Sequence, residues 1–182
     1  MPISISIPER ELFDQKTRMF IHVKSRTIEL EHSLLSISKW ESKWHKPYLS
    51  KEKKTKEETI DYIRCMCITR DVPEKAFYAL DGASFKKIAD YIADPMTATT
   101  FRKDPNERPS REIITNELVY YWMTELGIPF DPCQRWHFNR LMTLIRVSSI
   151  KKAPPKKMSQ KDWAMQRSML NAQRRAKFGS MG

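Results

Sequence analysis

Glycine is scarce in this sequence, with 4 in 182 residues, which argues against a turn-rich β-barrel and against glycine-rich phosphate loops. The 3 cysteines are too few for a disulfide framework and favour a reducing compartment. No apolar run reaches the roughly 18 residues of a transmembrane helix, so none is expected. The first residues have neither a basic start nor a long apolar stretch, so a signal peptide is not expected.

Positive charge is concentrated near the C-terminal end. Residues 1–150 contain 24 Lys and Arg against 21 Asp and Glu, whereas residues 151–182 contain 9 basic residues and one acid, Asp162. This last segment therefore carries +8 of the formal net charge of +11. A basic arm of this kind typically contacts nucleic acid, a membrane surface or an acidic protein segment. A solvated arm that only keeps the protein soluble is the alternative.

The first 32 residues have the pattern of β-structure. Ile3, Ile5 and Ile7 alternate with serines, which is the period of two expected for a strand. Residues 12–23 resemble a hairpin, and residues 27–30 can form a further strand. We expect a small antiparallel β element that packs on the rest of the chain.

Residues 33–150 predict a helical body, because apolar residues recur there at spacings of three and four. Thr55 and Glu58 form a capping box at one helix start, and Ser84, Ser110 and Asp131 are suitable caps for others. Residues 95–109 are expected to form a loop, since they contain three prolines. One predicted helical face consists of Ile114, Leu118, Tyr121 and Trp122. The predicted buried core comprises Trp40, Trp44, Ile63, Leu118, Trp122, Leu141 and Leu144.

The remaining segment, residues 151–182, is predicted to be a basic linker followed by a helix over about 160–177. Pro154 and Pro155 cannot continue the preceding helix. The apolar stripe of the last helix is narrow, so we expect this helix to dock on a partner or to fold on binding. The expected fold class is mainly α, with an N-terminal β element (1–32), a helical body (33–150) and this arm. The candidate partner-binding residues are Lys151, Lys152, Lys156, Lys157, Trp163, Arg167, Arg174, Arg175 and Lys177.

Two pairs of residues suggest chemistry without the pattern that would support it. Cys65 and Cys67 invite a metal site, but residues two apart on a helix point about 200° apart, so two core cysteines are the better interpretation. Cys133 and His137 would share a helical face, yet no glycine-rich oxyanion element accompanies them. We therefore expect no enzyme activity, no cofactor and no metal site.

Trp40 and Trp44 lie beside Lys39, Lys43 and Lys46 on one predicted helix. Basic residues interleaved with aromatic ones can stack nucleic-acid bases. An amphipathic helix with a buried aromatic face and solvated lysines explains the same pattern and is the favoured interpretation.

Several segments together resemble the tail assembly chaperones of long-tailed, siphovirus-like bacteriophages. The likeness runs in order through residues 30–49, 58–69, 91–101, 111–130 and 134–159, and its most specific parts are RWHFNRLMTLIRV and APPKKMS. The resemblance implies a protein that keeps the long tape-measure protein soluble while tail-tube subunits polymerise around it in the host bacterial cytoplasm. Families of this kind often produce a short form and a longer, frameshifted form.

The resemblance implies a set of partners: the tape-measure protein and the tail-tube protein, with a longer frameshifted chaperone form and self-association as further contacts, and no membrane. Ten methionines suit such a protein, because flexible thioether side chains adapt to varied apolar surfaces. The alternative from another class is a basic-armed nucleic-acid-binding or virion structural protein, such as a connector. Salt separates the two, since binding to nucleic acid weakens steeply as salt rises.

Overall fold

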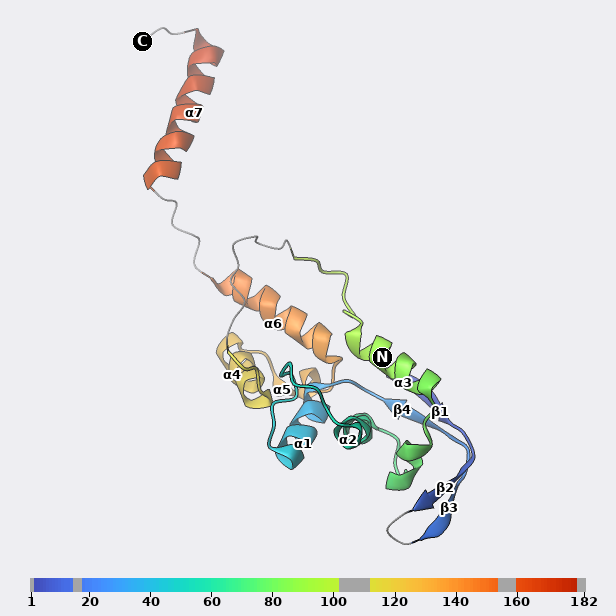
Figure 1. The fold of residues 1–182 in the computed structure, drawn as a ribbon. Helices are drawn as coiled ribbons and strands as arrows, with labels where there is room; N and C mark the ends of the chain where they lie inside the picture. The colour runs from blue at the N-terminus through green and yellow to red at the C-terminus, as the bar shows by residue number, and fades with distance from the viewer. Residues whose placement is uncertain (1, 15–17, 102–111, 154–159, 180–182) are drawn as a thin grey trace. The chain divides into compact units, whose positions relative to one another are not determined.

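The computed structural model describes residues 2–14, 18–101, 112–153 and 160–179, and these confirm a mainly α-helical fold with a small N-terminal β element (Figure 1). The strands are β1 (Ile3–Ile7), β2 (Arg10–Asp14), β3 (Met19–Val23) and β4 (Arg26–Leu30). The helices are α1 (Leu34–Trp44), α2 (Lys56–Met66), the 3-10 helix η1 (Glu74–Ala79), α3 (Gly82–Ala93), α4 (Asn116–Leu126), α5 (Phe130–Cys133), α6 (Phe138–Lys152) and α7 (Gln160–Phe178).

The chain forms two compact units, residues 1–151 and residues 152–182. The first unit holds the strands, the helices as far as α6 and the hydrophobic core. The second unit holds α7, which begins at Gln160 and ends at Phe178, close to the bounds that the sequence predicts.

The strands form two antiparallel pairs, β1 with β4 and β2 with β3, and the second pair continues from the far end of the first (Figure 1). Alternation places Ile5 and Ile7 on the buried face of β1, with Ile5 opposite Ile28 of β4. In the β2–β3 hairpin, Leu12 lies opposite Ile21. Because α3 and η1 contact β1, the sheet buries one face against the helical body.

Local capping fixes the starts of α1 and α2. The Ser33 hydroxyl accepts a hydrogen bond from the Ser36 N–H at 3.2 Å. The predicted capping box is present: Thr55 Oγ1 accepts from the Glu58 N–H, and the Glu58 carboxylate accepts from the Thr55 N–H at 2.7 Å. The two helices pack together, and Trp40 of α1, 1% exposed, donates its indole N–H to the Glu58 carbonyl.

Two helices begin at caps other than the predicted ones. The carboxylate of Asp81 caps α3 by accepting the Ser84 N–H at 2.8 Å, so Ser84 lies inside the helix. Helix α4 begins at Asn116, whereas the predicted start, Ser110, lies outside the described residues. The buried carboxylate of Glu41 accepts both the backbone N–H and the side-chain amide of Asn116, at 2.8 and 2.6 Å. A residue of α1, distant in sequence, therefore provides the cap for α4.

The helix predicted to start at Asp131 is interrupted. Residues 130–133 make only the short turn α5, and the backbone of Asp131 is extended within it. The following long helix, α6, begins at Phe138, whose N–H donates to the His32 carbonyl at 2.7 Å. The start of α6 is thus set by a contact with the β4–α1 junction.

The prediction of which face of α4 is buried is wrong, because the buried face is rotated by part of a turn from the predicted one. Val119 and Met123 are the fully buried side chains of α4, while Tyr121 is 57% exposed. Anchoring Asn116 to Glu41 fixes the rotation of the helix and turns the predicted face toward its edge. Of the predicted core, Trp40, Ile63 and Leu141 are buried, and the half-buried members are Trp44, Leu118, Trp122 and Leu144.

Two buried histidines join the sheet to three helices. His32, at the end of β4, shares a 2.5 Å hydrogen bond between its Nδ1 and the Tyr62 hydroxyl of α2. His137, before α6, donates from Nε2 to the Tyr91 carbonyl of α3 at 3.0 Å and accepts the Asn139 N–H at Nδ1. The two rings meet edge to face, with centroids 5.2 Å apart, and the side chains are 2% and 3% exposed.

Leu141 and Leu144, three residues apart on α6, make a matched pair for testing the core. Leu141 is fully buried, so replacing it by Ala removes packed atoms and should lower the free energy of unfolding by about 2–5 kcal/mol. The same change at half-buried Leu144 should cost about 1 kcal/mol. Urea unfolding of both variants measures the difference, and equal losses would contradict this assignment of the α6 faces.

Stability should fall as the pH is lowered from 7 to 5. Burial, with the neighbouring His137, lowers the pKa of His32 to about 3, and burial also lowers the pKa of His137. In the unfolded chain the His32 imidazole takes up a proton below about pH 6.5, whereas in the folded chain it stays neutral. His32 alone should therefore lower the free energy of unfolding by about 2 kcal/mol between pH 7 and pH 5.

Urea unfolding at the two pH values measures this loss. In His32→Gln, the loss between pH 7 and pH 5 should be smaller by about the contribution of one histidine. The control is His45→Asn, a substitution at an exposed left-handed position that Asn tolerates. An unchanged pH dependence in His32→Gln would show that this histidine does not couple protonation to folding.

Candidate partner-binding site

The predicted partner-binding residues fall on the end of α6 and on α7. Lys151 and Lys152 are exposed in the last turn of α6. Lys156 and Lys157 lie outside the described residues. The other predicted residues are exposed on α7, namely Trp163, Arg167, Arg174, Arg175 and Lys177.

One face of α7 combines aromatic, aliphatic and basic side chains. On the 3.6-residue period, Trp163, Arg167, Leu170, Arg174 and Lys177 share this face, which we call the Trp–Arg face. The guanidinium of Arg167 lies over the Trp163 ring, 5.1 Å from its centroid. Trp163 is nevertheless 54% exposed. The sequence analysis identified the basic residues of this face but did not assign them to one side of the helix. Their spacing of three and four residues is the signal that could have done so.

The opposite side of α7 has a line of methionine and alanine residues. Met165, Met169, Ala172 and Ala176 follow one another at spacings of four, three and four, and we call this the Met–Ala face. Met165 is 66% exposed and Met169 is exposed to a similar extent. Small and flexible apolar side chains in this arrangement suit close packing against another helix.

A groove between α4 and α6 is a feature that the sequence did not reveal. It has a volume of about 730 Å³, and its apolar lining includes Trp122 and Leu126 of α4, Met142 and Ile150 of α6, and Phe101 from the loop after α3. Ile150 is 56% exposed at its edge. The only feature of the sequence that hints at this groove is the presence of apolar residues on more than one side of α6.

The groove has one charged residue on each wall. Glu125 belongs to α4, and Arg146 of α6 lies over the Phe101 ring at 4.3 Å from its centroid. Helix α4 contains two glutamates, Glu117 and Glu125, and no basic residue. Glu117, however, lines a different pocket together with Glu41 and Asn116, so the single charges of the two groove walls balance.

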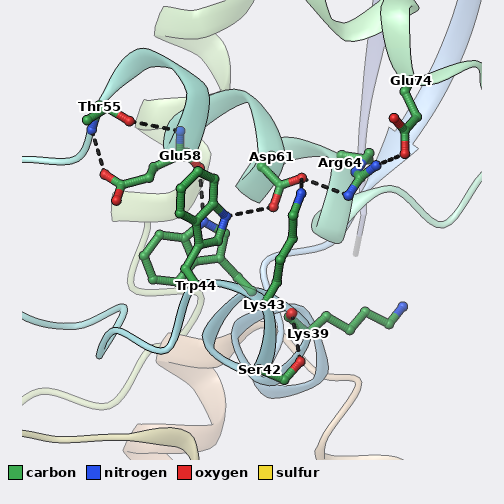
Figure 2. A network of polar contacts seen from close by, with 10 residues as sticks. Lys39, Ser42, Lys43, Trp44, Thr55, Glu58, Asp61, Arg64 and Glu74 are labelled. Atoms are coloured by element: carbon green, nitrogen blue, oxygen red, sulfur yellow. Dashed lines mark hydrogen bonds and ion pairs between the residues drawn. The ribbon is translucent and has the colours of Figure 1, made fainter.

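The aromatic and basic residues of α1 do not form a platform for nucleic-acid bases. Figure 2 shows Trp44 and Lys43 directed at α2: the Trp44 indole N–H donates to Asp61 at 2.8 Å, and Lys43 Nζ donates to the same carboxylate at 2.6 Å. Lys46 binds the buried Glu58 carboxylate at 2.6 Å. These side chains hold α1 against α2. The buried Trp40 agrees with the amphipathic-helix interpretation, but Lys43 and Lys46 are paired with carboxylates of α2 and are not merely solvated.

Asp61 is the centre of this network. Burial favours its neutral form, but the hydrogen bonds from Lys43 and Trp44 outweigh burial and lower its pKa. Arg64 reaches the same carboxylate at 2.8 Å and also pairs with Glu74 of η1 (Figure 2). One carboxylate thus connects α1, α2 and, through Arg64, η1.

The two cysteine pairs lack the geometry for the chemistry considered above. Cys67 is the C-cap of α2, so the two cysteines do not both lie within the helix as predicted, and burial raises the pKa of both thiols. Neither belongs to a group of three or more possible metal ligands among the described residues. Cys133 is buried at the end of α5, and His137 lies between α5 and α6, so the two do not share a helix. Both ring nitrogens of His137 bond to backbone groups, which leaves neither to accept a thiol proton.

Asp61→Asn should reduce the free energy of unfolding by about 2 kcal/mol, because charged hydrogen bonds from Lys43 and Trp44 become weak or mismatched. Asp90→Asn, at an exposed position of α3, is the matched control and should change little. Thermal or urea unfolding compares them, and equal stability of the two variants would show that the network contributes nothing net.

Among the residues that the structure describes, no helix is long and apolar enough to span a membrane. In the same part of the chain, no group of three or more His, Cys, Asp or Glu side chains is placed to hold a metal ion. Comparison of the chain with protein-family models, with curated proteins and with solved structures finds no match.

Proposed function

We propose that this protein is a tail assembly chaperone of long-tailed bacteriophages, which binds the tape-measure protein in the host bacterial cytoplasm and promotes assembly of the tail tube. The proposal starts from the resemblance of residues 30–49, 58–69, 91–101, 111–130 and 134–159 to that family. The observation that carries it is α7, a basic helix whose described side chains are all exposed.

Helix α7 has the composition of a binding element. Helices in proteins obtain most of their stability from packing an apolar face, and α7 leaves Trp163, Met165, Met169, Leu170 and Phe178 exposed. A partner that covers these side chains would remove their apolar surface from water, which favours binding. A tape-measure protein is a long helical chain with apolar stripes, so it offers a matching helical surface.

A binding role without catalysis is part of the proposal. We assign no catalytic or metal-binding role to Cys65, Cys67 or Cys133, and both ring nitrogens of His137 bond to backbone groups. The Met–Ala face is better suited to varied apolar clients than a rigid pocket is, because methionine adapts its shape. The tail-tube protein and a longer frameshifted form of the chaperone are further proposed partners.

The second candidate function is binding of nucleic acid. The specific observation in its favour is Arg167 over the exposed ring of Trp163, since a cation beside an accessible aromatic ring is common at sites for single strands. Salt distinguishes the candidates: nucleic-acid binding should weaken steeply between 50 and about 200 mM salt, while apolar client binding should largely persist.

Removing residues 152–182 should leave the melting temperature of the first unit nearly unchanged and should abolish the ability of the protein to keep the tape-measure product soluble on co-expression. The charge reversal Lys156→Glu, Lys157→Glu, Arg174→Glu, Arg175→Glu should weaken the same association, and more so at low salt, because exposed charges are screened as salt rises.

Lys86→Glu with Lys87→Glu, two exposed positions of α3, is the matched charge reversal outside the arm and should have no effect on the client. The measurements are the soluble fraction of the tape-measure product and its retention by the tagged chaperone. A truncated protein that unfolds, or one that keeps its client fully soluble, would contradict the proposed role of the arm.

A further inference from the structure

The β2–β3 hairpin gathers exposed apolar side chains at the end of the strand ribbon (Figure 1). Phe20 and Met19 of β3, at 71% and 63%, are the most exposed large apolar side chains in the described part of the first unit, and Phe13 of β2 is 55% exposed. The rings of Phe13 and Phe20 already pack together across the hairpin, with centroids 5.2 Å apart. An apolar cluster of this kind on a single chain typically marks an interaction surface.

The hairpin also has strand edges that are open to pairing. It is a two-stranded sheet, so each of its strands has a neighbour on one side only. Within the described ranges, no backbone hydrogen bond joins Met19–Val23 to a segment other than β2. About half of the N–H and C=O groups of an edge strand point away from its neighbour, so the outer edge of β3 can take up a further strand.

The two edges of the hairpin differ in charge. Strand β2 carries Arg10, Glu11 and Asp14, and the Asp14 carboxylate pairs with Lys75 of η1 at 2.6 Å. The five residues of β3, Met-Phe-Ile-His-Val, include no Lys, Arg, Asp or Glu. Charged side chains on an edge strand discourage its pairing with other chains. The edge of β2 is therefore protected by charge, whereas the edge of β3 is not.

We propose that β3 pairs antiparallel with β3 of a second copy of this chain, so that two hairpins form one four-stranded sheet about a two-fold axis. The sequence of β3 is self-complementary in this arrangement. With Ile21 opposite Ile21 of the second copy, Phe20 lies opposite His22 and Met19 lies opposite Val23. Each of these cross-strand pairs is apolar or aromatic, and none joins like charges. The two-fold axis repeats every pair, which is the usual symmetry of a dimer.

The second copy also completes the phenylalanine cluster, which is why we assign the edge to it. Phe13, Phe20 and His22 lie on the same face of the hairpin, as alternation along the strands requires. In the paired sheet, Phe20 of one copy is diagonal to Phe20 of the other, within reach of an aromatic side chain. Two separate exposed phenylalanine pairs thus become one apolar strip across four strands.

Two basic residues that flank β3 set the salt dependence of this contact. In the proposed register, Arg18 of one copy lies nearest to Lys24 of the other at each end of the paired strands. Salt screens the repulsion between exposed like charges. The dimer should therefore tighten as salt rises, whereas a complex held by the basic arm should weaken.

This inference goes beyond the proposed function and uses a surface separate from α7. Self-association is measured on the protein alone, whereas the client assay needs the tape-measure product. Either result can therefore fail without deciding the other.

Sedimentation equilibrium of the full chain at about 10–500 μM tests the proposal, because a contact between two short strands is small and small contacts give transient dimers. The wild type should dimerise, and hydrogen exchange of the Met19–Val23 amides should slow as the protein concentration rises. Phe20→Lys with His22→Lys places lysines opposite each other between the copies and should weaken the dimer by about tenfold or more. Both positions are exposed, and circular dichroism checks that the variant folds.

The matched control adds the same charge outside the hairpin. Tyr121→Lys with Ile150→Lys replaces two apolar side chains that are 57% and 56% exposed. This variant should dimerise as the wild type does.

A charge exchange makes the test specific to the proposed register. Phe20→Glu with His22→Glu should also be monomeric alone, because glutamates then face each other. An equimolar mixture of the Lys and Glu variants should form a heterodimer that is about tenfold tighter than the dimer of either variant, because each such pair then joins opposite charges.

Four results would overturn the proposal: a monomeric wild type, a Lys variant that dimerises as the wild type does, a control variant that loses dimerisation, or a mixture without heterodimer. A monomeric wild type whose Lys variant loses the tape-measure product on co-expression would identify an extended client segment as the occupant of the β3 edge, in place of the second copy.

Discussion

The body of the protein depends on a joint of buried histidines and backbone groups between the end of β4 and the start of α6. The carbonyl of His32 accepts a hydrogen bond from the first N–H of α6, and the imidazole of His32 bonds to the Tyr62 hydroxyl of α2. The imidazole of His137 bonds to the backbone of α3. Each of these polar groups is removed from water and would be costly if left unpaired. The joint therefore requires β4, α2, α3 and α6 to assemble together, and it requires both imidazoles to remain neutral.

Buried carboxylates extend this constraint to the remaining helices. Glu41 of α1 supplies the cap of α4, and Asp61 of α2 collects donors from α1 and from its own helix. Trp40, Trp44, Lys43 and Lys46 are all paired with groups of α2. Apolar surfaces that stay exposed among the described residues include the α4–α6 groove, both faces of α7 and the β2–β3 hairpin with Phe13 and Phe20.

Much of the local structure could be predicted because its causes lie within a few residues. The alternation of Ile and Ser in β1 and the Thr55–Glu58 box each depend on neighbours in sequence. The charge of the arm is visible for the same reason. The starts of α4 and α6 could not be predicted in this way, since their first donors bond to Glu41 and to the His32 carbonyl, far away along the chain.

The sequence by itself determined the helical class, the N-terminal β element and a basic C-terminal helix, because periodicity, capping residues and charge are properties of short segments. Only the tertiary structure decided which faces of those helices are buried. Anchoring α4 through Asn116 turns Val119 and Met123 inward and leaves Trp122 at the edge, where it becomes a wall of the groove. A rotation of one helix by part of a turn does not alter its periodicity, so the pattern of residues cannot specify it; the buried hydrogen bonds between distant segments do.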